Sequence, residues 1–137
     1  MTRTNPYRQG LEKTAANHVA LSPLSFLKRA AQVYPNRTSL IYGDQRFTWT
    51  QTEDRCRRLA SVLHRLGVPQ GDTVSTMLPN VPAMYEAHFG VPMTGAVLNT
   101  MNIRLNAEGL AFMLIHSGTK VLLTDPEFAD VVSQALS

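Results

Sequence analysis

Regular patterning of the chain begins at Ser22-Pro23, where a residue that caps helices precedes the proline favoured at the first helical position. Apolar residues then recur at helical spacing as far as Pro35, which is expected to end this helix because the residue before a proline avoids the helical conformation. Two β-prone runs follow, 39–42 and 46–49, with Gly43-Asp44 between them. Such runs around a short Gly-Asp turn predict a β-hairpin.

A second amphipathic helix is predicted directly after the hairpin. The segment Thr50-Gln51-Thr52-Glu53 has the spacing of a capping box, which marks a helix start. One face of the helix then carries Cys56, Leu59, Leu63 and Leu66. The helix is expected to end at Gly67, because glycine favours the left-handed conformation that terminates helices.

From Thr73 onward, predicted strands and helices alternate along the chain. Asn80 is expected to cap a helix that begins near Val81 and ends or kinks at Pro92, and Asn106 caps the next helix. Asp125-Pro126 marks the start of a last helix. The predicted strands are 73–78, 96–98 and 120–124. This alternation predicts an α/β fold with parallel strands and right-handed crossovers.

Length and charge narrow the class of protein. The 137 residues suit one domain, and 13 Lys+Arg against 10 Asp+Glu give a formal charge of only +3. The densest basic group is interpreted as the solvent face of the second helix, so no nucleic-acid partner is expected. That group consists of Arg55, Arg57, Arg58 and Arg65.

The single cysteine and the distribution of apolar residues bear on the compartment. Cys56 has no partner for a disulfide and is interpreted as a small core residue. No apolar run is long enough to span a membrane, and the first twenty residues do not resemble a secretion signal. A cytoplasmic location is therefore expected.

No local motif supplies an active site. The segment from Gly90 to Gly95 has the glycine spacing of a phosphate-binding loop, but Ala96-Val97 stands where lysine and a hydroxyl residue are required. His88 lies on one predicted helix stripe with Met84 and is interpreted as a core or interface histidine. The residues alone thus indicate an α/β domain without catalytic chemistry of its own.

An ordered set of short motifs nevertheless resembles a known family. The motifs are Tyr42-Gly43-Asp44, Phe47-Thr48-Trp49, Arg58-Leu59-Ala60, Leu66-Gly67-Val68, Gly71-Asp72, Leu78-Pro79-Asn80, Glu86, Gly95-Ala96-Val97, Asn99, Asn102, Arg104-Leu105, Ser117 and Lys120-Val121-Leu122. Their order and spacing resemble the N-terminal region of the acyl-adenylate-forming (AMP-binding) superfamily, and within it the fatty-acid-type acyl-CoA synthetases, or acyl-activating enzymes. Gly109 departs from the family pattern, in which glutamate is usual.

The resemblance implies a domain organisation and a reaction. Residues 1–21 are expected to form an N-terminal arm, and residues 22–137 the N-terminal portion of the AMP-binding domain, truncated before its phosphate loop. The family uses ATP to convert a carboxylic acid to an acyl-adenylate, and the thiol of CoA then displaces AMP. ATP, Mg²⁺ and CoA are therefore implied for the full-length protein, whereas this segment is expected to bind none of them.

No catalytic, cofactor-binding or metal-binding residue of the family maps onto this chain, so the matched residues are interpreted as scaffold. The scaffold residues are Gly43, Asp44, Gly71, Asp72, Pro79, Asn80, Gly95, Asn99, Asn102 and Arg104. The two Gly-Asp pairs are expected to form turns. Asn99, Asn102 and Arg104 are expected to order a loop or to contact a dimer partner, with the structural role favoured.

Three hypotheses about function follow. The first is an N-terminal fragment of an acyl-CoA synthetase, inactive on its own, whose partner is the rest of the parent enzyme; a homodimer through the N-terminal region is a further expectation. The alternative is a free-standing interaction module that reuses the scaffold and pairs with a full-length synthetase. A third, an independent nucleotide- or CoA-binding domain, ranks last because the chain has no phosphate loop.

Overall fold

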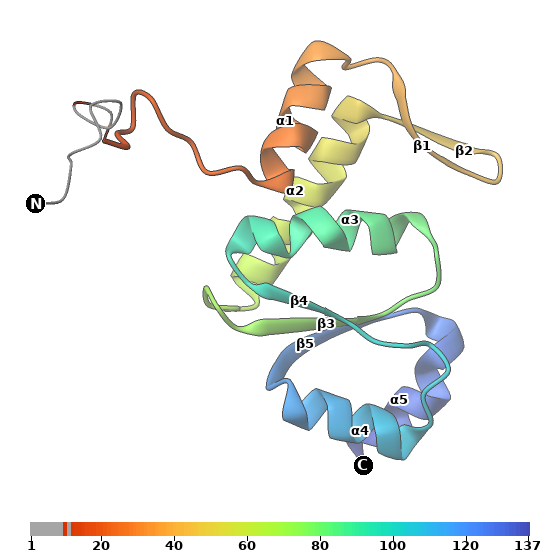
Figure 1. Cartoon of the computed structure of the whole chain (residues 1–137). Helices are drawn as coiled ribbons and strands as arrows, with labels where there is room; N and C mark the ends of the chain where they lie inside the picture. Colours follow the sequence, from red (N-terminus) through yellow and green to blue (C-terminus); the bar gives the residue numbers. More distant parts are fainter. Residues whose placement is uncertain (1–9, 11) are drawn as a thin grey trace, which may run out of the picture.

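A three-stranded parallel sheet lies at the centre of the protein (Figure 1). In this computed structural model, which describes residue 10 and residues 12–137, β3 (Thr73–Met77) pairs with β4 (Val97–Thr100) on one side and with β5 (Thr119–Thr124) on the other. The parallel order β4-β3-β5 confirms the predicted α/β fold. Ten residues of the predicted N-terminal arm, residues 1–9 and 11, lie outside the described residues.

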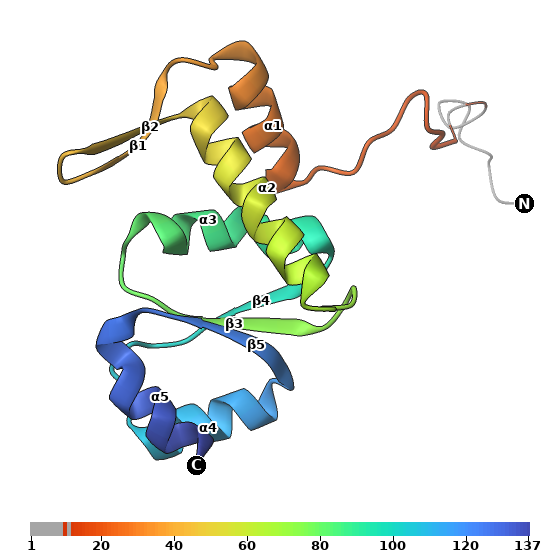
Figure 2. The same cartoon turned by 180° about the vertical axis from the view of Figure 1, so that it is seen from behind.

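Helices cover both faces of the sheet, as Figures 1 and 2 show from opposite sides. The helices α2 (Trp49–Arg65) and α3 (Pro82–Gly90) lie on one face, and α4 (Ala107–His116) and α5 (Ala129–Leu136) lie on the other. Side chains of β5 alternate between the two layers: Val121 and Leu123 pack in the α2/α3 core, and Leu122 packs in the α4/α5 core. These three side chains are partly buried, and a strand covered by helices on both faces is typical of parallel sheets.

The first helix and the hairpin lie outside this sandwich. The helix α1 (Pro23–Val33) packs on α2 and buries Leu27 and Ala31. The hairpin of β1 (Thr38–Tyr42) and β2 (Gln45–Thr48) is antiparallel and projects away from the sheet (Figure 1). The Ser22 side chain caps α1, and Pro23 is its first residue, as predicted.

Three local predictions are wrong. The capping box of α2 is formed by Thr48 and Gln51, two residues earlier than predicted, because Trp49 is already helical. Leu66 is 61% exposed, since it follows the last helical residue instead of continuing the buried face. Asn80 does not cap α3; the N-cap is Val81, which makes no side-chain capping bond, and Pro82 supplies the helix start.

The other helix ends lie at or near their predicted residues, whereas the predicted strand 96–98 is displaced towards the carboxyl end as β4, Val97–Thr100. The helix α3 ends at Gly90, and Pro92 begins a 3-10 helix, Pro92–Thr94. The Asn106 side chain accepts a hydrogen bond from Gly109 N and caps α4. Asp125 caps a short 3-10 helix, Pro126–Phe128, that leads into α5. Within the part of the chain described, no helix has the length and apolar character needed to cross a membrane.

Candidate functional site

The residues predicted as scaffold fall at four separate places. Gly43 and Asp44 form the tip of the hairpin, where the φ of +54° at Gly43 suits glycine. Gly71, Asp72 and Gly95 lie together at the amino end of the sheet. Gly71 N donates to Gly95 O at 2.9 Å, and Asp72 O accepts from Val97 N at 2.8 Å. These backbone bonds fix the start of β4 beside the start of β3.

The opposite, carboxyl end of the sheet carries the third group. Pro79 and Asn80 follow β3, and Asn102 and Arg104 follow β4. Ligand sites of open α/β sheets lie at this end of the strands. Asn102 Oδ1 accepts a hydrogen bond from Arg104 N at 2.9 Å, so this side chain orders its own loop. Asn80, Asn102 and Arg104 are exposed.

Asn99 lies inside the sheet, in a chain of polar side chains that crosses all three strands. Its Nδ2 donates to Ser75 Oγ at 3.1 Å, and Ser75 Oγ lies 2.6 Å from Thr119 Oγ1. Thr119 Oγ1 in turn lies 2.7 Å from Ser117 Oγ. Asn99 therefore satisfies a buried serine of the central strand.

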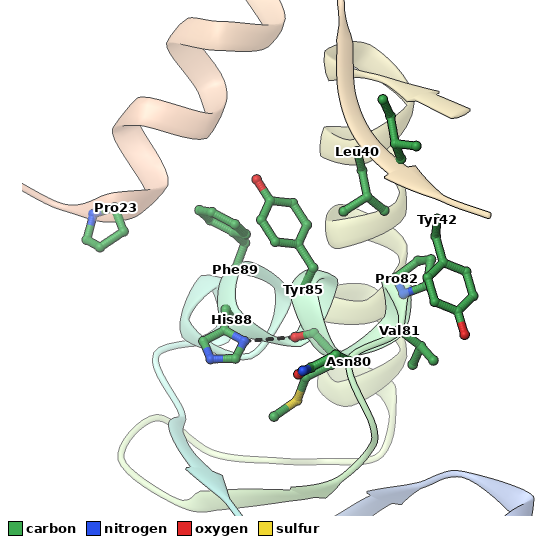
Figure 3. Close-up of a pocket in the computed structure, with 11 residues that line it drawn as sticks. Pro23, Leu40, Tyr42, Asn80, Val81, Pro82, Tyr85, His88 and Phe89 are labelled. Atoms are coloured by element: carbon green, nitrogen blue, oxygen red, sulfur yellow. Dashed lines mark hydrogen bonds between the residues drawn. The ribbon is translucent and has the colours of Figure 1, made fainter. Parts of the chain in front are cut away.

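An apolar pocket of about 620 Å³ lies between the hairpin and α3 (Figure 3). Tyr85 and Phe89 form one wall, with their ring centroids 5.3 Å apart in an edge-on arrangement. Burial raises the pKa of the Tyr85 hydroxyl. The residues that line the pocket are Pro23, Leu40, Ile41, Tyr42, Asn80, Val81, Pro82, Met84, Tyr85, His88 and Phe89.

His88 was expected to be a core or interface histidine, and the structure contradicts the core alternative. Its side chain is exposed, and Nδ1 is hydrogen-bonded to Met84 O one helical turn earlier at 2.8 Å, as Figure 3 shows. The ring therefore lies at the edge of the pocket with one nitrogen held by the backbone. Spacing on α3 placed His88 and Met84 together but did not indicate that Met84 is half-buried and His88 exposed.

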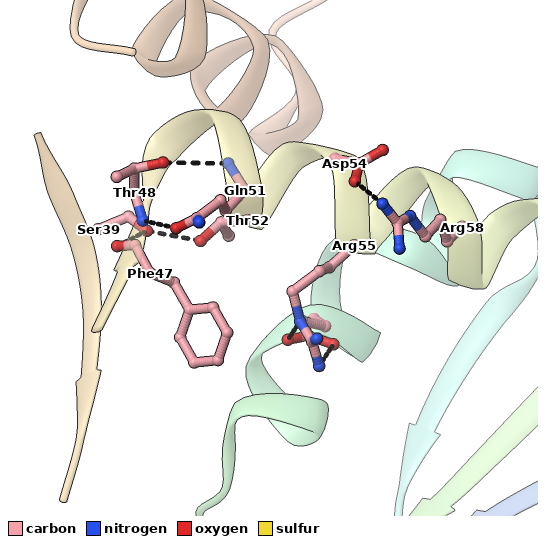
Figure 4. A network of polar contacts seen from close by, with 9 residues as sticks. Ser39, Phe47, Thr48, Gln51, Thr52, Asp54, Arg55 and Arg58 are labelled. Atoms are coloured by element: carbon pink, nitrogen blue, oxygen red, sulfur yellow. Dashed lines mark hydrogen bonds and ion pairs between the residues drawn. The ribbon is translucent and has the colours of Figure 1, made fainter. Parts of the chain in front are cut away.

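A network of polar contacts joins the hairpin, α2 and α3 (Figure 4). Ser39 Oγ on β1 lies 2.5 Å from Thr52 Oγ1 on α2. Arg55 on α2 binds Glu86 on α3 through Nε at 2.5 Å and Nη2 at 3.2 Å. The guanidinium of Arg55 also lies 5.0 Å from the Phe47 ring centroid. Arg55 thus connects three elements; its side chain is 43% exposed, as a residue of the solvent face should be, but the prediction missed its contacts to the hairpin and α3.

A pattern in the sequence distinguishes Arg55 from its neighbours. Arg57 and Arg58 have acidic residues four positions earlier, Glu53 and Asp54, and they pair with them on the surface. Arg55 has Gln51 at that position. Among the three arginines at positions 55, 57 and 58, the one without an acidic residue four positions earlier was the available indication of a longer-range contact, although Arg65 shares that feature.

The buried thiol has no nucleophilic character. Cys56 is 0% exposed in α2, and burial raises its pKa from 9.0 to about 12. This confirms its interpretation as a core residue. Among the described residues, no three His, Cys, Asp or Glu side chains gather in a way that would hold a metal ion.

Comparison with known proteins establishes the family. The AMP-binding enzyme family model matches residues 27–137. A butyrate–CoA ligase of Arabidopsis thaliana, AAE11, is 57% identical over 121 residues, which are 88% of this chain and 21% of the ligase. A benzoate–CoA ligase of the same plant is 54% identical over 121 residues, again 88% of this chain and 21% of the relative.

Solved structures agree with the fold. The Mycobacterium tuberculosis fatty acyl CoA synthetase matches 80% of this chain and 22% of its own, with a TM-score of 0.77 and 31% identity. The chain belongs to the AMP-binding enzyme family, and its relatives are acyl-CoA ligases. It spans about a fifth of the length of the curated relatives that it matches.

Proposed function

We propose that this chain is the N-terminal part of an ATP-dependent acyl-CoA synthetase. The whole enzyme would convert a carboxylic acid, ATP and CoA to acyl-CoA, AMP and pyrophosphate through an acyl-adenylate. The observation that carries the proposal is the family match over residues 27–137. In this proposal residues 1–21 are an arm, and residues 22–137 are the first portion of the AMP-binding domain.

The proposed role of the segment is structural support. The ten scaffold residues described above lie in turns, at strand ends or within the sheet, and the chain matches only 21% of the butyrate–CoA ligase. We therefore expect ATP, Mg²⁺ and CoA to be bound by the whole enzyme, and the isolated chain to be inactive. Its proposed partner is the remainder of the synthetase, and a homodimer through the N-terminal region is proposed for the whole protein.

A fatty acid is the proposed substrate class, and a cytoplasmic location is proposed. A relative named for butyrate and a neighbour named as a fatty acyl CoA synthetase support the substrate class. The two plant relatives are themselves named peroxisomal. Co-localisation of a fluorescently tagged full-length protein with a peroxisomal marker would contradict the cytoplasmic proposal.

Immunocapture from the source organism tests the proposed function. An antibody raised against residues 39–66 is used to recover the native product, whose mass and acid-dependent ATP–pyrophosphate exchange are then measured. We expect a product several times heavier than 15.2 kDa that catalyses exchange with butyrate or longer fatty acids. A single 15.2 kDa product without exchange would instead favour the free-standing interaction module.

A further inference from the structure

Two apolar pockets of this structure share a wall. The pocket between the hairpin and α3 is described above, and a second pocket, of about 290 Å³, lies between α1 and α3. Phe26, Tyr34 and Trp49 line the second pocket, and Tyr85 and Phe89 line both. The two pockets therefore form one continuous apolar surface, which we call the α1–hairpin–α3 face.

Large side chains on this face are open to solvent. Phe26 is 59% exposed, Tyr34 49%, Ile41 63% and Tyr42 46%. Folded monomers rarely leave a contiguous apolar surface of this kind uncovered, and exposed aromatic residues around a pocket are typical of protein interfaces. The face thus has the chemistry of a docking surface for an apolar protein segment.

Charges at the rim disfavour a second copy of this chain as the occupant. Arg29 lines the second pocket, Arg37 lies 5.1 Å from the Tyr34 ring centroid, and Arg46 is opposite Ile41 in the hairpin. Two copies placed face to face would bring these like charges together. An occupant from a different polypeptide segment meets this repulsion only where it carries positive charges of its own.

We propose that the α1–hairpin–α3 face is the docking surface for the remainder of an acyl-CoA ligase, and that this chain binds such a remainder without a covalent link. The proposal rests on the proposed function. The matched region is 21% of the butyrate–CoA ligase, so about four fifths of that protein is available to cover the face. Rim groups such as the His88 ring, already oriented by Met84 O, provide polar contacts at the edge of the interface.

Co-expression tests the proposal. This chain, carrying an affinity tag, is expressed with Arabidopsis butyrate–CoA ligase from which the 121 matched residues have been deleted. We expect the truncated ligase to co-purify with the tagged chain in equal amounts. The double variant Ile41→Lys/Tyr42→Lys is expected to lower the recovered ligase about tenfold or more, because it places two charges on the apolar face.

A matched control uses the other exposed apolar surface. Ile115 on α4 is 82% exposed and lies outside the lining of both pockets. Ile115→Lys is expected to change recovery less than twofold. Circular dichroism of each variant verifies that the chain stays folded. The truncated ligase alone can be insoluble. In that case the proposal is supported if the ligase becomes soluble when it is co-expressed with the wild-type chain but stays insoluble with the double variant.

Several outcomes would overturn the proposal. One is a soluble, folded wild-type chain that fails to recover the truncated ligase; another is equal loss with Ile115→Lys. A third is self-association of this chain that the Ile41→Lys/Tyr42→Lys substitutions abolish and that the truncated ligase does not reduce. That result would assign the face to a second copy of the chain. A chimera in which this chain replaces the 121 matched residues of the butyrate–CoA ligase separates this proposal from the proposed function. If the chimera is active while the separate pieces do not bind, only this proposal fails. If the chimera is folded but inactive, the proposed function itself is contradicted.

Discussion

Arg55 on α2 and Glu86 on α3 form a two-point ion pair, with Nε–Oε1 at 2.5 Å and Nη2–Oε2 at 3.2 Å. Glu86 is buried, and the hydrogen bonds to it are the main cause of a raised pKa at Arg55. The guanidinium also contacts the ring of Phe47. One side chain thereby ties the hairpin and both helices of this layer together.

Removing this arginine is expected to destabilise the chain more than removing its neighbours. Arg55→Ala leaves the buried Glu86 carboxylate without its charged partner, and we expect a loss of about 1–3 kcal/mol in the free energy of unfolding. Arg57→Ala breaks only an exposed pair on one helix and is expected to cost about 0.5 kcal/mol or less. Urea denaturation of both variants measures the difference.

A double-mutant cycle separates the pair from general effects of substitution. Glu86→Ala is combined with Arg55→Ala, and the coupling energy is expected to exceed about 1 kcal/mol. A coupling energy near zero would show that the contact makes no net contribution.

Gly90 is expected to tolerate no side chain. A Cβ at this position would lie 2.8 Å from Leu59 Cδ2 and 3.0 Å from Cys56 O, because α3 approaches α2 closely here. Gly90→Ala should therefore lower the free energy of unfolding by about 1–3 kcal/mol. Gly67→Asn is the comparison: its Cβ meets open space, so its cost comes only from the φ of +74°, which strains side chains and which asparagine tolerates better than most residues. Thermal melts in which both variants lose the same stability would contradict the close approach.

The thiol of Cys56 should be unreactive while the protein is folded. Burial raises its pKa to about 12, so alkylation by iodoacetamide at pH 8 is expected only after urea unfolds the chain. The unfolded thiol ionises at lower pH than the folded one. Keeping the Cys56 thiol protonated therefore costs the folded state nothing below about pH 9. As pH rises from about 9 towards 12, ionisation of the unfolded thiol lowers the free energy of unfolding, by up to about 1.4 kcal/mol per pH unit. Cys56→Ala should remove that part of the pH dependence.

Ser75 is expected to be important to the sheet because it accepts from Asn99 and contacts Thr119 while fully buried. Ser75→Ala removes the acceptor of Asn99 Nδ2 and one of the two hydroxyl partners of Thr119, and should cost about 1–3 kcal/mol. Thr100→Ala, at an exposed position of β4, should be within about 0.5 kcal/mol of wild type. Chemical denaturation in which Ser75→Ala is as stable as wild type would contradict the role of this polar chain.

Local chemistry predicted most of the fold. Ser22-Pro23, Gly43, Pro92 and Asn106 act within a few residues of their own position, so their effects on helix and turn boundaries follow from the sequence. The observed start of a helix differs from the predicted one where two neighbouring residues could each cap it. Thr48 and Thr50 are both followed three residues later by a side chain that can complete a capping box, and the helix begins at the earlier one.

Tertiary contacts could not be read in the same way. Asn80 resembles an N-cap, but Pro82 starts the helix and leaves Asn80 in the loop beside the apolar pocket. The pairing of Arg55 with Glu86 joins residues 31 positions apart, and periodicity within α2 carries no information about α3. The pocket itself combines side chains from α1, the hairpin and α3, whose relative placement only the folded chain reveals.

A chimeric enzyme tests the central claim most directly. The 121 matched residues of Arabidopsis butyrate–CoA ligase are replaced by the corresponding residues of this chain, and butyryl-CoA formation from butyrate, ATP and CoA is measured beside the parent ligase and this chain alone. If the chain is the N-terminal scaffold of an acyl-CoA synthetase, the chimera retains activity within about tenfold of the parent and the isolated chain has none. A folded chimera without activity, or butyryl-CoA formation by the isolated chain, would contradict the account.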